Sequence, residues 1–92
     1  MATDSEPLIF EDEIVTTNTT ITNCNDIDAN NITVGIGTML PTLKLKSTGG
    51  SVKIGNGSKV ESGATLELES TGGSVKIESG FKVESGASFI IK

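Results

Sequence analysis

Apolar and polar residues alternate along most of the second half of the chain. Val52 and Ile54 flank Lys53, and the run Leu66-Glu67-Leu68 repeats the same pattern. A period of two residues is typical of β-strands with one face buried and the other in water. Each alternating stretch is only about four or five residues long, and glycine-rich corners separate the stretches. The pattern therefore predicts an all-β chain built from many short strands.

These strands belong to an internal repeat of 23 residues. Residues 47–69 read STGGSVKIGNGSKVESGATLELE and residues 70–92 read STGGSVKIESGFKVESGASFIIK, with 15 of 23 positions identical. Three short strands and three corners in each repeat are typical of one coil of a three-sided parallel β-solenoid. Successive coils stack about 4.8 Å apart, so equivalent residues of the two repeats are expected to lie above one another.

The stacking places like residues on like residues in the expected core. The expected pairs are Val52 with Val75, Ile54 with Ile77, Val60 with Val83, Leu66 with Phe89 and Leu68 with Ile91. On the outer surface, Lys44 is expected opposite Glu67 and Lys46 opposite Glu69, as ladders of opposite charge. We expect the core to be formed by Leu66, Leu68, Val75, Ile77, Val83, Phe89 and Ile91.

A duplicated antiparallel hairpin protein is the alternative fold. Asn56-Gly57 would suit a two-residue hairpin turn. The second repeat has Ser79-Gly80 at that place, and the pattern around it is unchanged, which favours the solenoid.

Four segments follow from the repeat. Residues 1–13 are expected to be an acidic arm with one apolar island, residues 14–46 an irregular first coil or coil and a half, and residues 47–69 and 70–92 two regular coils. Residues 35–41 exceed the matching corner at 62–64, so we expect a looped-out corner there. The fold expected is thus an all-β, three-sided parallel β-solenoid of about three coils with an N-terminal acidic arm.

Composition excludes several classes of function. The 92 residues include 11 Gly and three Phe, no His, Trp or Tyr, and carry a net charge of −5. Without His the usual general base and the commonest metal ligand are missing, and no nucleophile–base pair is visible, so we expect neither an enzyme nor a cofactor. An acidic chain without Arg is not expected to bind nucleic acid, and no apolar run is long enough for a membrane helix.

The charges are unevenly distributed along the chain. Residues 1–43 hold seven acidic residues and no lysine, whereas residues 44–92 hold seven lysines and five glutamates. Such a dipolar chain can attract the opposite end of another copy of itself. The simpler interpretation is that both halves are solvated.

Two short features are candidate sites. Asp26, Asp28 and Asn30 have the spacing of a calcium loop, but Asn31 and Gly37 stand where such a loop needs Gly and Glu, so they are weak metal candidates. The alternative is a strand with Ile27 and Ala29 facing inward. Cys24 has no cationic neighbour in sequence, so we expect a buried or half-buried, inert thiol, with an intermolecular disulfide as the alternative.

Residues 74–89, SVKIESGFKVESGASF, resemble the short β-solenoid modules described as coat-hanger stacks, which occur near the C-termini of secreted Bacteroidetes proteins. The family pattern is roughly apolar-x-apolar-x-x-Gly-Phe-x-apolar-x-x-Gly-Ala-x-Phe. It matches well over 74–91, less well over 51–68, where Ser58 replaces the phenylalanine, and not over 1–20. The resemblance implies an extracellular, non-catalytic module of about three coils that accompanies adhesins or secreted enzymes. The chain is more distantly similar to bactofilins, cytoplasmic β-helices that polymerise end to end but have a shorter coil repeat.

The last coil is expected to leave unpaired backbone groups and an open apolar core. We expect a second copy to cover it, with Phe89, Ile90 and Ile91 as the docking edge and with Leu8, Ile9 and Phe10 as a donor strand. Such a head-to-tail contact propagates as a filament unless it closes into a ring.

The function expected is therefore that of a non-enzymatic structural subunit that assembles into an extracellular or cell-surface filament of a bacterium. The alternative is a monomeric attachment, spacer or carbohydrate-binding module of a larger secreted protein, with a glycan or a cell surface as its partner. Three Phe without Trp or Tyr give a poor aromatic platform for a sugar.

Overall fold

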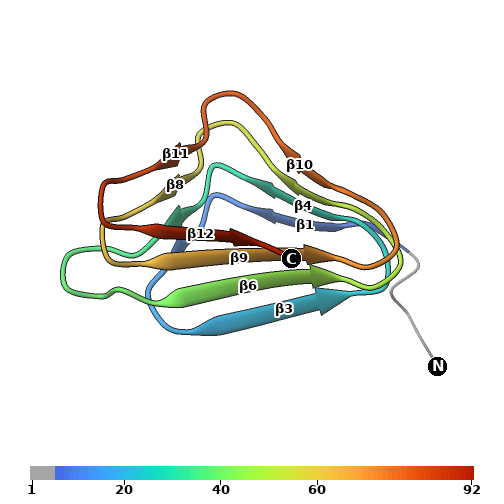
Figure 1. The fold of residues 1–92 in the computed structure, drawn as a ribbon, viewed down its shortest axis with the longest axis horizontal. Helices are drawn as coiled ribbons and strands as arrows, with labels where there is room; N and C mark the ends of the chain where they lie inside the picture. Colours follow the sequence, from blue (N-terminus) through green and yellow to red (C-terminus); the bar gives the residue numbers. More distant parts are fainter. Residues whose placement is uncertain (1–5) are drawn as a thin grey trace.

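The structure is a computed structural model that describes residues 6–92. Within these residues the chain forms twelve strands and no helix. The strands are β1 (Leu8–Glu11), β2 (Ile14–Val15), β3 (Thr19–Asn23), β4 (Ile27–Asn30), β5 (Thr33–Val34), β6 (Thr42–Ser47), β7 (Val52–Ile54), β8 (Lys59–Val60), β9 (Thr65–Ser70), β10 (Val75–Ile77), β11 (Lys82–Val83) and β12 (Ser88–Ile91). They form three four-stranded sheets, β1-β4-β7-β10, β2-β5-β8-β11 and β3-β6-β9-β12. Each coil gives one strand to each sheet, so the chain winds as a three-sided β-solenoid (Figure 1).

The predicted stacking register is confirmed at every core pair. Val52 lies beside Val75, Ile54 beside Ile77, Val60 beside Val83, Leu66 beside Phe89 and Leu68 beside Ile91. All pairings between the named strands are parallel, which excludes the antiparallel hairpin alternative.

The structure differs from the expectation at the N-terminal end, where it has an additional coil. Leu8–Glu11 is strand β1 of a first coil and pairs with β4, so the described chain has four coils instead of about three. Leu8 and Phe10 are half-buried against the core, which is why this segment joins the solenoid and is not a separate arm. Residues 1–5 of the expected arm lie outside the described residues.

Differences in coil length are absorbed at the corners. In the sheet that contains β1, equivalent residues are 19 positions apart between the first and second coils (Leu8 and Ile27), 25 between the second and third (Ile27 and Val52) and 23 between the third and fourth (Val52 and Val75). The expected looped-out corner at residues 35–41 is present, and an antiparallel bridge between Ile36 and Met39 closes it.

One corner of each coil needs a residue with positive φ. This residue is Asp12 (57°), Asn31 (53°), Gly57 (82°) and Gly80 (93°) in the four successive coils. Asp and Asn tolerate the left-handed region better than other side chains, so they replace glycine in the first two coils. A Cβ atom at Gly57 would lie 2.9 Å from Asn31 Oδ1, so a larger residue there would have to displace the Asn31 amide as well as adopt a positive φ.

Serine side chains hold the corners that precede β7 and β10. The Ser47 hydroxyl donates to the Asn25 carbonyl (2.6 Å) and accepts from the Gly50 N–H (2.9 Å). One coil later, the Ser70 hydroxyl donates to the Gly50 carbonyl (2.7 Å) and accepts from the Gly73 N–H (3.0 Å). The repeated Ser-Thr-Gly-Gly sequence is therefore a structural motif that ties each corner to the one below.

The core is a set of aliphatic columns that run along the solenoid axis. Its buried hydrophobic residues are Val15, Ile27, Ala29, Ile32, Val34, Leu43, Leu45, Val52, Ile54, Val60, Ala64, Leu66 and Leu68. Most of them belong to the two central coils, since those coils have a neighbour on both sides.

Shortening one side chain in the middle of a core column and one at its end tests this description. Leu68 is fully buried in the third coil, and Ile91, next in the same column, is 50% exposed. We expect Leu68→Ala to lower the free energy of unfolding by about 2–5 kcal/mol, because it leaves a cavity, and Ile91→Ala by less than about 1 kcal/mol in dilute solution. Urea unfolding followed by circular dichroism measures both, and losses of equal size would contradict a closed middle with an open end.

Candidate functional site

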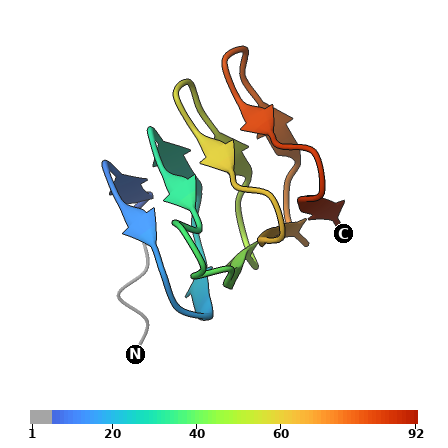
Figure 2. The same cartoon turned by 90° about the vertical axis from the view of Figure 1, so that its left-hand side faces the viewer.

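The C-terminal end of the solenoid is an apolar surface. Seven positions of the last coil face inward, and all of them are apolar: Val75, Ile77, Phe81, Val83, Ala87, Phe89 and Ile91. Ile77, Val83 and Ile91 are 47%, 41% and 50% exposed, whereas their neighbours one coil below are fully buried. Figure 2 shows why: the last coil (red) has a neighbour on one side only. Of the seven residues expected to form the core, only Leu66 and Leu68 are therefore fully buried.

Two aromatic rings pack together on this end. Phe81, from the corner before β11, meets Phe89 of β12 edge to face, with ring centroids 5.1 Å apart and planes at 61°. Phe89 is one of the predicted edge residues, whereas Phe81 was not predicted to lie there. Its position after Gly80 marked it, because the residue after the positive-φ corner faces inward in every coil that follows the first.

The expected docking residues do not all lie on the two ends. Phe89 and Ile91 face the C-terminal end, but Ile90 points outward from β12, in register with Glu67. Leu8 and Phe10 face inward in the first coil, whereas Ile9 points outward and is 55% exposed. Neighbouring residues of a strand face opposite sides, so Ile9 and Ile90 can contribute backbone groups to a docking edge but not inward side chains. The docking role of both segments stays a prediction.

The N-terminal end is more polar than the C-terminal end. Thr19 occupies the column of Leu43 and Leu66, and Asn23 occupies the column of Ser47. The Asn23 amide donates to the carbonyls of Glu6 (3.2 Å) and Asp26 (3.0 Å), so it closes the corner beneath β4. Residues 6–26 contain five carboxylates and no lysine, whereas residues 70–92 contain three lysines and two glutamates.

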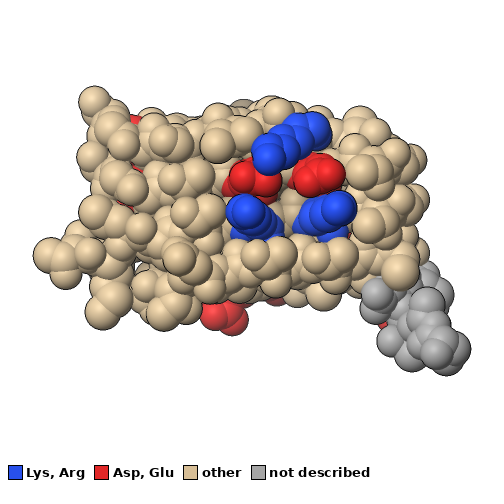
Figure 3. Space-filling model, turned by 60° about the horizontal axis from the view of Figure 1, so that its bottom comes forward, with Lys and Arg blue, Asp and Glu red and all other residues tan. Residues whose placement is uncertain are grey.

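A ladder of alternating charge covers the outer face of the sheet formed by β3, β6, β9 and β12. The expected register of Lys44 with Glu67 and of Lys46 with Glu69 is confirmed. Figure 3 shows lysines and acidic residues in alternating rows on this face. Lys46 Nζ lies 3.9 Å from Glu69 Oε2, and Lys92 Nζ lies 3.4 Å from Glu67 Oε2. Such exposed pairs stabilise little but favour one register over others.

A second ladder joins three coils through Lys53. Its Nζ lies 3.3 Å from Asp28 Oδ1 in the coil below and 3.8 Å from Glu78 Oε2 in the coil above. The hydrogen bond to Asp28 and the negative charges of both carboxylates raise the pKa of Lys53 above its ordinary value. This lysine therefore has a partner on each side along the solenoid axis.

The residues with calcium-like spacing form part of this surface. Ile27 and Ala29 are fully buried, so the strand interpretation is confirmed. Asp28 pairs with Lys53, and the Asp26 carboxylate accepts from the Ser51 N–H at 2.8 Å. The Asn30 amide donates to Asp28 Oδ1 at 3.2 Å. Residues 6–92 bring no three His, Cys, Asp or Glu side chains together into a group that could hold a metal ion.

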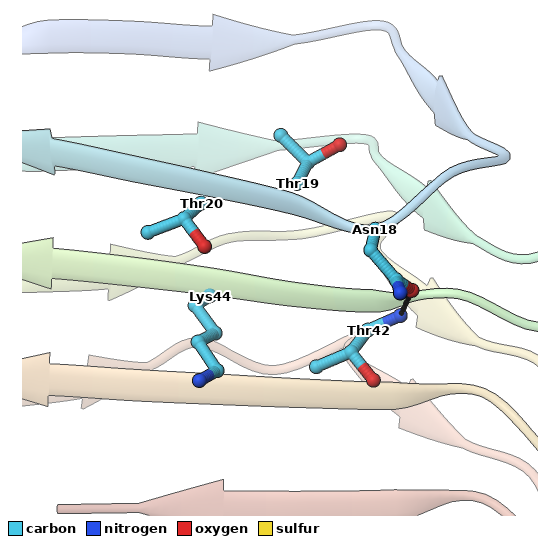
Figure 4. A pocket seen from close by; sticks show the side chains of 5 residues that line it. All are labelled: Asn18, Thr19, Thr20, Thr42 and Lys44. Carbon is cyan, nitrogen blue, oxygen red and sulfur yellow. Dashed lines mark hydrogen bonds between the residues drawn. The ribbon is translucent and has the colours of Figure 1, made fainter.

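A shallow polar depression lies where β3 and β6 begin (Figure 4). Its volume is about 350 Å³, and it is lined by Asn18, Thr19, Thr20, Thr42 and Lys44. The Asn18 side chain is already engaged, since its Oδ1 accepts from the Thr42 N–H at 2.9 Å. Hydroxyl and ammonium groups remain as the polar groups of this hollow.

Cys24 lies in the corner between β3 and β4 and is exposed. The expectation of a buried or half-buried thiol was therefore wrong. Asn23 precedes it and takes the inward position, so the cysteine side chain faces solvent.

Replacement of Lys53 by methionine tests the second ladder. Because folding raises the pKa of Lys53, its charge stabilises the fold fully below the ordinary lysine pKa of about 10.4 and loses this effect as the pH rises through the higher pKa of the folded chain. We expect the wild type to be more stable than Lys53→Met at pH 7 and the difference to shrink at a pH above the ordinary lysine pKa of about 10.4. Urea unfolding at pH 7 and at that higher pH measures this difference.

The matched control for this experiment is Lys76→Met, one coil above on the same face. Lys76 forms no ion pair within residues 6–92, so its replacement is expected to change the unfolding free energy little at pH 7. If the difference in unfolding free energy between the wild type and Lys53→Met is the same at both pH values, the ion pairs of Lys53 do not stabilise the fold.

Residues 6–92 contain no helix that is long and apolar enough to cross a membrane. Comparisons with protein-family models, curated proteins and solved structures found no match to this chain.

Proposed function

We propose that this chain is a non-enzymatic structural protein, a β-solenoid subunit that assembles head to tail into an extracellular filament. The observation that carries the proposal is the C-terminal end, where every inward position is apolar and three of these side chains are 41–50% exposed. Natural sheet edges and apolar patches of this kind are normally covered or blunted. A protein partner that continues the three sheets would cover this one.

The first coil of a second copy fits this requirement. If the coil spacing continues across the contact, β10 pairs with β1, β11 with β2 and β12 with β3 of the second copy. The inward columns then continue as well: Val75 meets Leu8, Ile77 meets Phe10, Val83 meets Val15 and Ile91 meets Ile21 of the second copy. Because the two surfaces of such a contact differ, it repeats indefinitely unless it closes into a ring.

The charges of the two end coils favour the same head-to-tail orientation of the subunits. The first coil carries five carboxylates without a lysine, and the last coil carries Lys76, Lys82 and Lys92. Opposite potentials speed the encounter of two surfaces and disfavour the contact of two first coils. Because salt screens this attraction, association is expected to be slower at high salt.

The extracellular location and the absence of catalysis rest on the sequence. Residues 74–89 resemble secreted coat-hanger modules, and a chain without histidine lacks the side chain most used for proton transfer near neutral pH. Both statements are parts of the proposal.

A second candidate is a monomeric attachment or spacer module with a carbohydrate ligand. The polar depression at Thr20, Thr42 and Lys44 favours it, because sugar hydroxyls bind such groups. The depression has no aromatic lining residue, and aromatic stacking is what most sugar sites add to hydrogen bonds. This candidate is therefore the weaker one.

The assembly test uses one substitution at two positions of the last coil. Ile77 faces the C-terminal end and is 47% exposed, and Ile90 faces the outer surface and is 41% exposed. Ile77→Lys would bury an unpaired charge in the contact, so we expect it to abolish assembly while the monomer keeps its fold. Ile90→Lys places the same charge opposite Glu67 on the outer face, so we expect it to leave assembly intact.

Light scattering across a concentration series and negative-stain microscopy measure assembly, and circular dichroism checks the fold. A filament of four-coil subunits is expected to repeat every ~19 Å along its axis. A wild type that stays monodisperse at millimolar concentration would contradict the filament and support the monomeric candidate. Equal assembly of both lysine variants would show that the end surface is not the contact.

A further inference from the structure

Glu13 holds a position in the first coil that the other coils give to residues suited to the core. It directly follows the positive-φ residue Asp12, just as Ile32 follows Asn31 in the second coil. The corresponding residues of the third and fourth coils, Ser58 and Phe81, follow Gly57 and Gly80.

Backbone hydrogen bonds place these four residues in one column. The carbonyl of Glu13 accepts from the Thr33 N–H at 2.9 Å. The carbonyls of Ile32 and Ser58 accept in the same way from Lys59 (2.8 Å) and Lys82 (3.0 Å) of the following coils. Glu13, Ile32, Ser58 and Phe81 are therefore equivalent positions of successive coils.

This column faces the core. Ile32 is fully buried, Ser58 is 1% exposed, and Phe81 packs against the core cluster although it lies in the last coil. The Ser58 hydroxyl is satisfied there, because it accepts from the Ile32 N–H at 3.2 Å. Glu13 itself is exposed, and no described coil lies beneath it.

We propose that Glu13 is a gate residue that restrains head-to-tail assembly. This inference rests on the proposed function. When a second copy docks its last coil beneath the first coil, its Phe81 comes to lie under Glu13, and the carboxylate is enclosed between an aromatic ring and the core. Burying a carboxylate that has no cation or hydrogen-bond donor as partner costs free energy and so opposes docking. Inward-pointing charges are a known way to protect a sheet edge from uncontrolled pairing.

No cation is positioned to relieve this restraint. Within residues 6–92, Glu13 forms no ion pair. In the docked arrangement the nearest lysine of the second copy by register, Lys82, lies under Ile14 and faces the outer surface. Glu13 must therefore turn out of its column before the two coils can close.

The gate makes the two ends unequal. Each C-terminal end is ready to dock, whereas each N-terminal end accepts a partner only against the resistance of Glu13. Subunits therefore stay apart at low concentration, and assembly begins when the concentration is high enough to overcome that resistance. The solenoid gains a threshold for assembly without any change in its fold.

Replacing Glu13 with isoleucine, the residue at the equivalent position of the second coil, tests the gate. We expect Glu13→Ile to lower the protein concentration at which filaments appear by about tenfold or more, since tenfold corresponds to only about 1.4 kcal/mol. The matched control is Glu11→Ile, the same substitution two residues earlier at an outward-facing position of β1. It is expected to change that concentration less than about threefold, a bound that allows for altered net charge and surface apolarity.

Light scattering gives the threshold concentration, microscopy confirms filament shape, and thermal melts confirm the fold of each variant. If an isoleucine variant does not fold, Glu13→Gln against Glu11→Gln makes the same comparison. Equal shifts at positions 11 and 13 would overturn the gate and leave the proposed function standing, provided that Ile77→Lys still blocks assembly.

A double variant tests whether the effect of Glu13 acts through end-to-end docking. Ile77→Lys added to Glu13→Ile is expected to abolish the gain in assembly. If the double variant assembles as readily as Glu13→Ile, the gain does not come from end-to-end docking, and both the gate and the proposed function fail. If Glu13→Ile stays monomeric at millimolar concentration, both fail as well.

Discussion

Parallel stacking of equivalent residues is the constraint on which the rest of this structure depends. Leu66 is fully buried because Leu43 and Phe89 lie in register on its two sides, and no second layer of structure covers it. This arrangement explains how a chain with 35% hydrophobic residues and only three aromatic ones closes a core. Small aliphatic side chains suffice, since each contacts its own kind about 4.8 Å away. The same arrangement leaves the inward residues of an end coil half covered. The central coils therefore provide most of the stability, whereas the candidate functional surface lies on the last coil.

Stacking is useful only if the register is unique, because a slip by one residue would turn every inward side chain to the outside. Three devices fix it here, and each is weak alone. Lysines face carboxylates in neighbouring coils, as Lys53 does on both sides. Serine hydroxyls tie each Ser-Thr-Gly-Gly corner to the corner below. The positive-φ corner admits only Gly, Asn or Asp at one position of each coil. Strand slippage would break all three together, so local signals agree with the global fold.

The regular half of the fold, residues 47–92, could be predicted from sequence, because its similar repeats indicate both the strand period and the stacking pairs. The first coil could not, for two physical reasons. Asp12 and Asn31 take the left-handed conformation that glycine marks elsewhere, so the corner signal is hidden. The 19-residue spacing between the first two coils breaks the period, although the strand register is kept. At the candidate site, the apolar end was foreseen but Phe81 was not, because its inward position is evident only when it is compared with the equivalent residues of the other coils.

The two ends show that an open solenoid needs asymmetric protection if it is to stack in one direction. Two bare apolar ends would associate in any combination, and two charged ends would not associate at all. Here the last coil has seven apolar inward positions, while the first coil places Glu13, Thr19 and Asn23 among its inward positions. Contact between two first coils would bring together two inward carboxylates and two acidic surfaces, which is the least favourable pairing. Contact between last and first coils meets only one such carboxylate and gains opposite charge. In the proposed head-to-tail assembly, one inward carboxylate at one end would therefore both favour one direction of growth and oppose it.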